Sequence, residues 1–166
     1  EPFSNLDPAL RRSIREDILA ILRKANATAV MVTHDTDDAL AIGDRVAIFR
    51  SGRVEQTGSP AEIYHHPANG YCARLFGPAN EVRLNGSEPT WVRPENMQLL
   101  EAAAEGAVPV RLQRVRNAGR HVEAIVEPLG ADASERKESW TVFADSSALS
   151  IPEGKEVWVS WEAIPG

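Results

Sequence analysis

The sequence predicts two parts of different fold class, an α/β part over residues 1–78 and a small all-β barrel over residues 79–166. In the first part, apolar residues repeat at three- and four-residue spacing over residues 8–25, as in an amphipathic helix, and a buried-strand pattern follows. In the second part, short runs of β-type residues alternate with turn residues, which is typical of a small barrel. Gly77-Pro78 separates the two patterns, so we place the domain boundary there.

The first part begins with a helix, a strand and a second helix. Asp7 followed by Pro8 predicts a helix start, because the carboxylate can accept free amide hydrogens and proline needs no hydrogen-bond acceptor there. Residues 29–32 form a continuous apolar run, which indicates a strand buried on both faces, and a second helix is expected over residues 37–42. This order favours an α/β layer with parallel strands.

A hairpin and two short helices complete the first part. Residues 45–50 and 53–56 flank Ser51-Gly52, which predicts two strands joined by a two-residue turn. Ser59 and Glu62 have the spacing of a capping box, so a short helix should begin there and end before Pro67. One more helix is expected over residues 71–76.

The second part contains several β-type runs separated by turns. Turn residues stand at 117–119, 130–132 and 152–154. The expected strands cover residues 90–93, 108–115, 121–126, 139–143 and 157–161.

Composition excludes some classes of function. The 166 residues include 18 basic and 24 acidic side chains, and the formal net charge of -6 argues against nucleic acid as the main partner. Cys72 is the only cysteine, so no internal disulfide can form, and no apolar run reaches the length of a membrane span. The chain starts without Met on residues that read like the interior of a longer protein, so we expect it to be a truncated piece of one.

His34 is the most suggestive single residue. In Val32-Thr33-His34-Asp35 the histidine follows a predicted buried strand, and ligands bind at the carboxyl ends of strands in open α/β sheets. A histidine that only hydrogen-bonds at a capped strand end fits the same spacing equally well.

Three segments decide between these readings: EPFSNLDPALR, VTHDTDDALAIGDRVAIFRSGRVEQTGSPAEIYHHPAN and WVRPENMQL. In this order they resemble the ATP-binding subunits of ABC importers for sugars, polyamines, sulfate and ferric iron. The resemblance covers essentially the whole chain. It implies the α/β C-terminal part of a P-loop ATPase domain followed by an all-β OB-like regulatory barrel, the TOBE domain.

The resemblance also assigns roles to three residues. Glu1 corresponds to the catalytic glutamate that orients or deprotonates the attacking water, and His34 to the switch histidine that hydrogen-bonds the γ-phosphate. Asp7 corresponds to the D-loop aspartate, which in the family faces the partner subunit across the nucleotide. Asp37 and Asp38 need no role in the reaction, because acidic residues are favourable at a helix start.

The sequence contains neither a Gly-x-x-x-x-Gly-Lys-Ser/Thr loop nor a Leu-Ser-Gly-Gly-Gln signature. We therefore expect ATP and Mg²⁺ to act in a longer parent enzyme and this chain alone to be inactive. The resemblance implies a homodimer of the parent, bound to membrane permease subunits at the cytoplasmic face. The chain itself is expected to be soluble, and residues 29–33 should make it self-associate, because the strand would lack neighbours.

The transported solute is not readable from the sequence. Ferric iron is the first choice of solute, on the overall character of the sequence and on residues 76–81, while polyamine, sulfate and sugar stay open. An alternative reading is a freestanding module that senses a small anion or dimerises. A nucleic-acid-binding barrel is a third reading, which the charge balance disfavours.

Other candidate sites are weak. His65 and His66 point apart on a helix and have no further ligand at metal spacing, so we assign no metal. A basic cluster in the second part suits either an anion or a solvated hairpin. Its residues are Arg111, Arg114, Arg116, Arg120 and His121. Tryptophans concentrate in the second part, where core packing is the expected use. They are Trp91, Trp140, Trp158 and Trp161.

Overall fold

The computed structural model describes residues 7–83, 87–129 and 138–161. The chain divides into two compact units, Glu1–Tyr64 and His65–Gly166, which we describe separately. The second unit includes the last helix before Gly77-Pro78, and the domain boundary after Pro78 stays a prediction. Within the described residues, no helix combines the length and apolarity that crossing a bilayer requires.

The first unit begins with two helices, α1 (Pro8–Ala25) and α2 (Thr36–Ile42), both of which were predicted. Helix α1 ends at Asn26, which adopts the left-handed conformation (φ 48°, ψ 41°) and donates its amide hydrogen to the carbonyls of Arg23 and Leu22. Arg23 and Lys24 lie in the last turn, where positive charge is favourable.

The hairpin and the capping box are also confirmed. Strands β1 (Val46–Arg50) and β2 (Arg53–Gly58) pair antiparallel, and positive φ at Ser51 (50°) and Gly52 (77°) fits the tight turn between them. At the start of α3 (Pro60–His65), the Ser59 amide donates to Glu62 Oε2 at 2.7 Å, and the Glu62 amide donates to Ser59 Oγ at 3.3 Å.

The buried parallel strand predicted at residues 29–33 is wrong. These residues form no strand, and Val30 and Val32 are 92% and 79% exposed. A strand needs a neighbouring backbone for its hydrogen bonds, and every strand pair in the described residues is antiparallel and excludes this segment. Apolar composition alone therefore did not produce a strand here.

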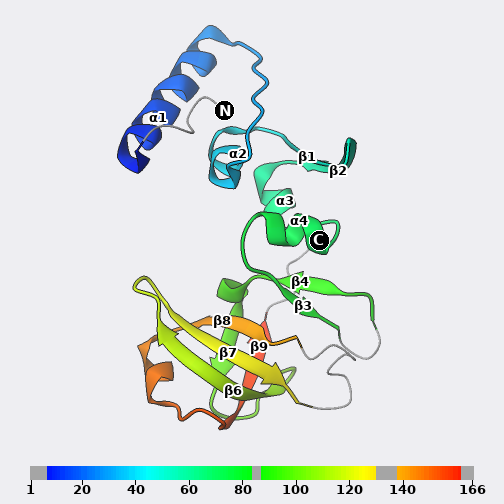
Figure 1. The fold of residues 1–166 in the computed structure, drawn as a ribbon, viewed down its shortest axis with the longest axis vertical. Coiled ribbons are helices and arrows are strands. Elements are labelled where there is room, and N and C mark those ends of the chain that lie inside the picture. The colour runs from blue at the N-terminus through cyan, green and yellow to red at the C-terminus, as the bar shows by residue number, and fades with distance from the viewer. Residues whose placement is uncertain (1–6, 84–86, 130–137, 162–166) are drawn as a thin grey trace. The chain divides into compact units, whose positions relative to one another are not determined.

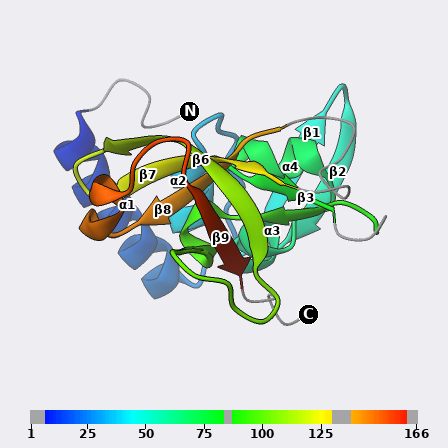
Figure 2. The same ribbon diagram turned by 90° about the horizontal axis from the view of Figure 1, so that it is seen from below.

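The second unit is built on an antiparallel sheet (Figure 1). Helix α4 (Gly70–Leu75) leads into a small hairpin of β3 (Asn80–Val82) and β4 (Thr90–Val92). The larger sheet has five strands in the order β5-β9-β6-β7-β8, and Figure 2 shows β9 beside β6. Its strands are β5 (Met97–Leu100), β6 (Val108–Asn117), β7 (Val122–Pro128), β8 (Trp140–Ala144) and β9 (Glu156–Trp161). Two short 3-10 helices, η1 (Pro94–Asn96) and η2 (Ser146–Ser150), flank it.

The core lies on one face of this sheet. Alternate residues of β7, namely Val122, Ala124 and Val126, are buried, as expected for a strand with one face in the core. Val110 and Leu112 of β6 join the same cluster.

A closed OB-like barrel is not confirmed. The hydrogen-bonded order has β5 and β8 as its two ends, so the structure supports a mixed α/β chain with a mostly antiparallel sheet. The edge strand β8 is contacted instead by the side chain of Asn80 from β3.

Candidate functional site in the first unit

Asp7 stands at the start of α1. Its Oδ1 accepts hydrogen bonds from the amides of Ala9 and Leu10, each at 3.1 Å, while the residue stays exposed. The predicted capping role is thereby confirmed, and a role toward a partner subunit stays a prediction. Glu1, the predicted catalytic glutamate, lies outside the described residues.

His34 lies just before α2 and is exposed. The next residue, Asp35, is the helix cap: its Oδ1 accepts from the amides of Asp37 at 2.9 Å and Asp38 at 3.2 Å. The amide of Asp35 in turn donates to Thr33 Oγ1 at 3.0 Å. Local hydrogen bonds thus fix the backbone on the C-terminal side of His34.

Arg15 links the middle of α1 to the start of α2 and was missed as a site residue in the sequence analysis. Its guanidinium forms an ion pair with the carboxylate of Asp38, and its Nη2 lies 4.0 Å from Asp35 Oδ1. Asp38 is only 3% exposed. Its carboxylate is therefore a buried charge paired with Arg15, in addition to being an acidic group at a favourable place in the first turn of a helix.

The sequence did hold a signal for Arg15. It stands three residues before Ile18, four before Leu19 and seven before Leu22, which places it on the half-buried stripe of α1 rather than on the solvent face. A charge at such a position needs a partner, and α2 supplies two carboxylates.

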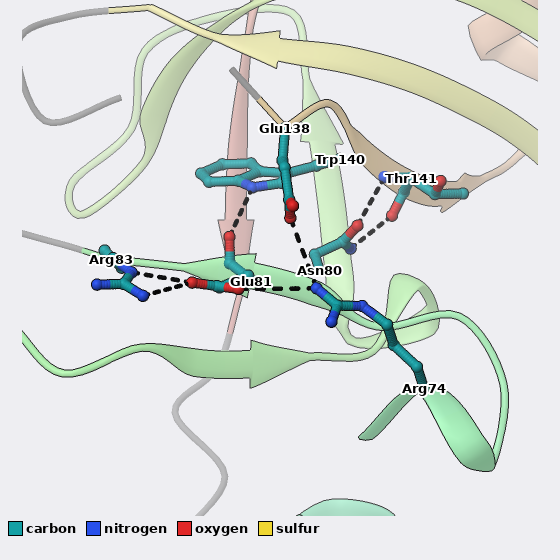
Figure 3. A network of polar contacts seen from close by, with 7 residues as sticks. All are labelled: Arg74, Asn80, Glu81, Arg83, Glu138, Trp140 and Thr141. Atoms are coloured by element: carbon teal, nitrogen blue, oxygen red, sulfur yellow. Dashed lines mark hydrogen bonds and ion pairs between the residues drawn. The ribbon is translucent and has the colours of Figure 1, made fainter. Parts of the chain in front are cut away.

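A polar network in the second unit connects β3 to β8 (Figure 3). Glu81 pairs with Arg83 at 2.7 Å and with Arg74 of α4 at 3.7 Å, and Arg74 also lies 3.7 Å from Glu138. The indole of Trp140 donates to the carbonyl of Glu81 at 3.0 Å. These contacts attach the small hairpin to the edge of the sheet.

Arg93, from the WVRPEN segment, is buried to 2% exposure. Its Nη1 donates to three backbone carbonyls, of Ala73 at 2.9 Å, Gly77 at 3.2 Å and Pro78 at 3.1 Å. Arg93 therefore satisfies carbonyls at and beyond the end of α4, a position where unpaired carbonyls are costly.

The predicted basic cluster is partly neutralised. Nε of Arg116 donates to Glu123 Oε2 at 2.6 Å, and Nε2 of His121 lies 3.3 Å from Glu123 Oε1. The His121 ring also stacks on the ring of Phe143, with 3.8 Å between the ring centroids. The Arg116 hydrogen bond is the main cause that lowers the pKa of Glu123, and burial opposes it. Arg111, Arg114 and Arg120 are exposed.

The tryptophans follow the expected packing role in part. Trp140 is 5% exposed within the core and meets Trp161 edge-on at 5.8 Å. Trp91 and Trp158 are half-buried on β4 and β9.

Comparison with curated proteins gives a consistent result. The chain is 39% identical over 129 residues to the spermidine/putrescine import ATP-binding protein PotA of Oleidesulfovibrio alaskensis, covering 77% of the chain and 33% of that protein. It is 46% identical over 82 residues to the Fe(3+) ions import ATP-binding protein FbpC of Agrobacterium fabrum, covering 49% of the chain and 23% of that protein.

A longer match is found with the sulfate/thiosulfate import ATP-binding protein CysA of Pseudomonas putida. The identity is 30% over 158 residues, covering 95% of the chain and 47% of that protein. The chain thus spans less than half the length of each of these relatives. No protein-family model matches the sequence.

Proposed function

Since the chain belongs to the family of ABC importer ATP-binding subunits, we propose that it carries the switch histidine, the D-loop aspartate and the regulatory β domain of such a subunit. In this proposal the subunit hydrolyses ATP with Mg²⁺, and the hydrolysis powers import of a solute.

The observation that carries the proposal is the placement of His34. It is exposed directly before α2, and Asp35 holds the backbone beside it by capping that helix. An exposed imidazole at this position can donate a hydrogen bond to the γ-phosphate of ATP and so respond to its cleavage. Glu1 would orient or deprotonate the attacking water, as it does at the matching position of the family.

Asp7 supports the same proposal at the start of α1. Its Oδ1 is engaged by two amides, yet the residue is exposed, so a second surface can approach the start of the helix. In the proposed enzyme that surface belongs to a second copy of the subunit, and the permease subunits bind the pair at the cytoplasmic face of the membrane.

ATP and Mg²⁺ would be held mainly by parts of a longer subunit. This chain contains no phosphate-cradling loop, so we expect its own 166 residues to bind neither with useful affinity. Among the described residues, His34 is the one we assign to the γ-phosphate.

The solute is proposed only as one of the classes that the relatives' names give. These names include spermidine/putrescine, Fe(3+) ions and sulfate/thiosulfate. These names do not favour ferric iron over the other solutes.

The test is a His34→Ala substitution in a subunit that contains this chain, with steady-state ATP hydrolysis as the readout. We expect kcat to fall by about 100-fold or more, as when one donor to a charged transition state is removed. His66→Ala, an exposed histidine of the second unit, is the matched control and should retain activity. Equal activity of His34→Ala and the unmodified subunit would contradict the proposal.

A second candidate is an anion-sensing role for the second unit. The exposed guanidinium groups of Arg114 and Arg120 on the β6–β7 hairpin favour it, while the pairing of Arg116 with Glu123 speaks against it. Calorimetry with molybdate, sulfate and phosphate tests it. Micromolar 1:1 binding that is lost in Arg114→Gln would support this candidate.

A further inference from the structure

Helix α1 carries Asp7 at its start and Arg15 two turns later. Their separation of eight positions corresponds to about 12 Å along a helix axis. Because the helix is continuous over Pro8–Ala25, the start of α1 and the backbone of Arg15 belong to one element.

Arg15 contacts the two carboxylates that define the start of α2. Asp35 is the cap residue and Asp38 lies in the first turn. The side chains of Arg15 and Asp38 are 17% and 4% exposed, so solvent screens this pair much less than it screens a surface ion pair. Removing the guanidinium would leave a buried carboxylate without its counter-charge, which is strongly unfavourable.

His34 is the residue immediately before this capped start. Its neighbour Asp35 is held on three sides, by the amides of Asp37 and Asp38, by Thr33 Oγ1, and by the charge of Arg15. Any shift of Asp35 therefore moves the backbone of His34.

We propose that Arg15 is a positioning residue that ties His34 to helix α1, and through that helix to Asp7. The inference rests on the proposed function of His34 at the γ-phosphate. It adds a mechanical link between the two segments that face the nucleotide: a displacement of the Asp7 end of α1 reaches His34 through Arg15 and Asp35.

The link matters for the rate more than for substrate binding. A hydrogen bond to a reacting phosphate depends on placement within a fraction of an ångström, and a misplaced group lowers the rate even when the substrate still binds. Loss of Arg15 should therefore lower kcat and leave KM for ATP nearly unchanged.

The first experiment uses the 166-residue chain itself and needs no nucleotide. Amide hydrogen exchange of Asp37 and Asp38 and ¹⁵N relaxation of His34 are compared in the unmodified chain, Arg15→Gln, Arg15→Lys and Arg12→Gln. We expect exchange to be about tenfold faster, or more, in Arg15→Gln, with a lower order parameter at His34. Arg15→Lys should recover part of the effect.

Arg12→Gln is the matched control, because Arg12 lies exposed on the same helix. Unchanged exchange and His34 order in Arg15→Gln would overturn the proposal, as would an equal effect of Arg12→Gln. If Arg15→Gln lowers the helical circular dichroism signal, the double variant Arg15→Asp with Asp38→Arg, in which the two charges are exchanged, decides whether the link exists. Recovery of slow exchange then supports the link, and no recovery overturns it.

The second experiment measures ATP hydrolysis by a subunit that contains this chain. A kcat lowered by about tenfold or more in Arg15→Gln, with KM within about twofold, supports the link. An unmodified subunit without ATPase activity would overturn the proposed function, while the exchange data still decide the role of Arg15. An active subunit whose kcat is insensitive to Arg15→Gln would overturn only this inference.

Discussion

The side-chain amide of Asn80 pairs with both backbone groups of Thr141. Its Oδ1 accepts from the Thr141 amide and its Nδ2 donates to the Thr141 carbonyl, both at 2.7 Å. Nδ2 also lies 3.1 Å from the sulfur of Met97 at the start of β5. One side chain thus occupies the place of a strand residue on the edge of β8 and touches β5, the opposite end of the sheet.

We expect Asn80→Leu to destabilise the second unit by about 2 kcal/mol or more. Leucine has a similar size but leaves the amide and carbonyl of Thr141 without their partner. Urea unfolding followed by tryptophan fluorescence measures the change. Asn117→Leu, which removes only an exposed turn contact to the Gly119 amide, should cost less than about 1 kcal/mol. Equal losses in the two variants would contradict the role of Asn80.

Arg93→Met should destabilise the same unit by about 3 kcal/mol, because three carbonyls lose a charged donor in a buried place. Arg93→Lys should recover only part of this, since an ammonium does not reproduce the planar guanidinium geometry. The exposed Arg114 gives the control: Arg114→Met should stay within about 0.5 kcal/mol of the unmodified chain. Thermal unfolding of the three variants checks the order.

Features governed by neighbouring residues were predictable from the sequence. The cap at Asp7, the capping box of Ser59 and Glu62, and the turn at Ser51-Gly52 are all confirmed, because each depends on contacts within a few residues.

Features that depend on distant partners were not predictable. Residues 29–33 have the composition of a buried strand, but a strand forms only where another backbone accepts and donates its hydrogen bonds. The position of Arg15 on the half-buried stripe of α1 indicates that it needs a partner, but the partner itself, Asp38, lies 23 residues away in α2 and could not be identified from local spacing. The hydrogen bonds between Asn80 and Thr141 join residues 61 positions apart, and no local sequence pattern predicts them.

Glu123 should make the stability of the second unit depend on pH. The Arg116 hydrogen bond holds the pKa of Glu123 below its ordinary value of 4.5 in the folded state. The ionised form is therefore favoured by folding, so its contribution is fully present above pH 4.5 and is lost as the pH falls through the lowered pKa.

We expect Glu123→Gln to be less stable than the unmodified chain at pH 7, by less than about 1 kcal/mol as is usual for a screened ion pair. The difference should shrink as the solution is acidified below pH 4.5. Urea unfolding at several pH values measures it. Arg116→Met should flatten the same pH dependence, whereas Glu105→Gln, at an exposed position, should leave it intact. A difference that grows on acidification would contradict this account.

The exposed apolar segment at residues 29–33 should make the chain self-associate. Val30 and Val32 are 92% and 79% exposed, and the backbone there belongs to no strand pair among the described residues. An unpaired segment of this composition is a template for pairing with a second copy. We expect static light scattering at tens of micromolar to show species larger than a monomer, and Val30→Lys with Val32→Lys to shift them toward the monomer. Leu149→Lys, at a 48% exposed position in the second unit, should leave the distribution of oligomers unchanged, because Leu149 does not stand in a comparable run of apolar residues. A monomer in the unmodified chain would contradict this prediction. The exposed Val30 and Val32 would then drive no association and would be tolerated in water, as single exposed apolar residues are.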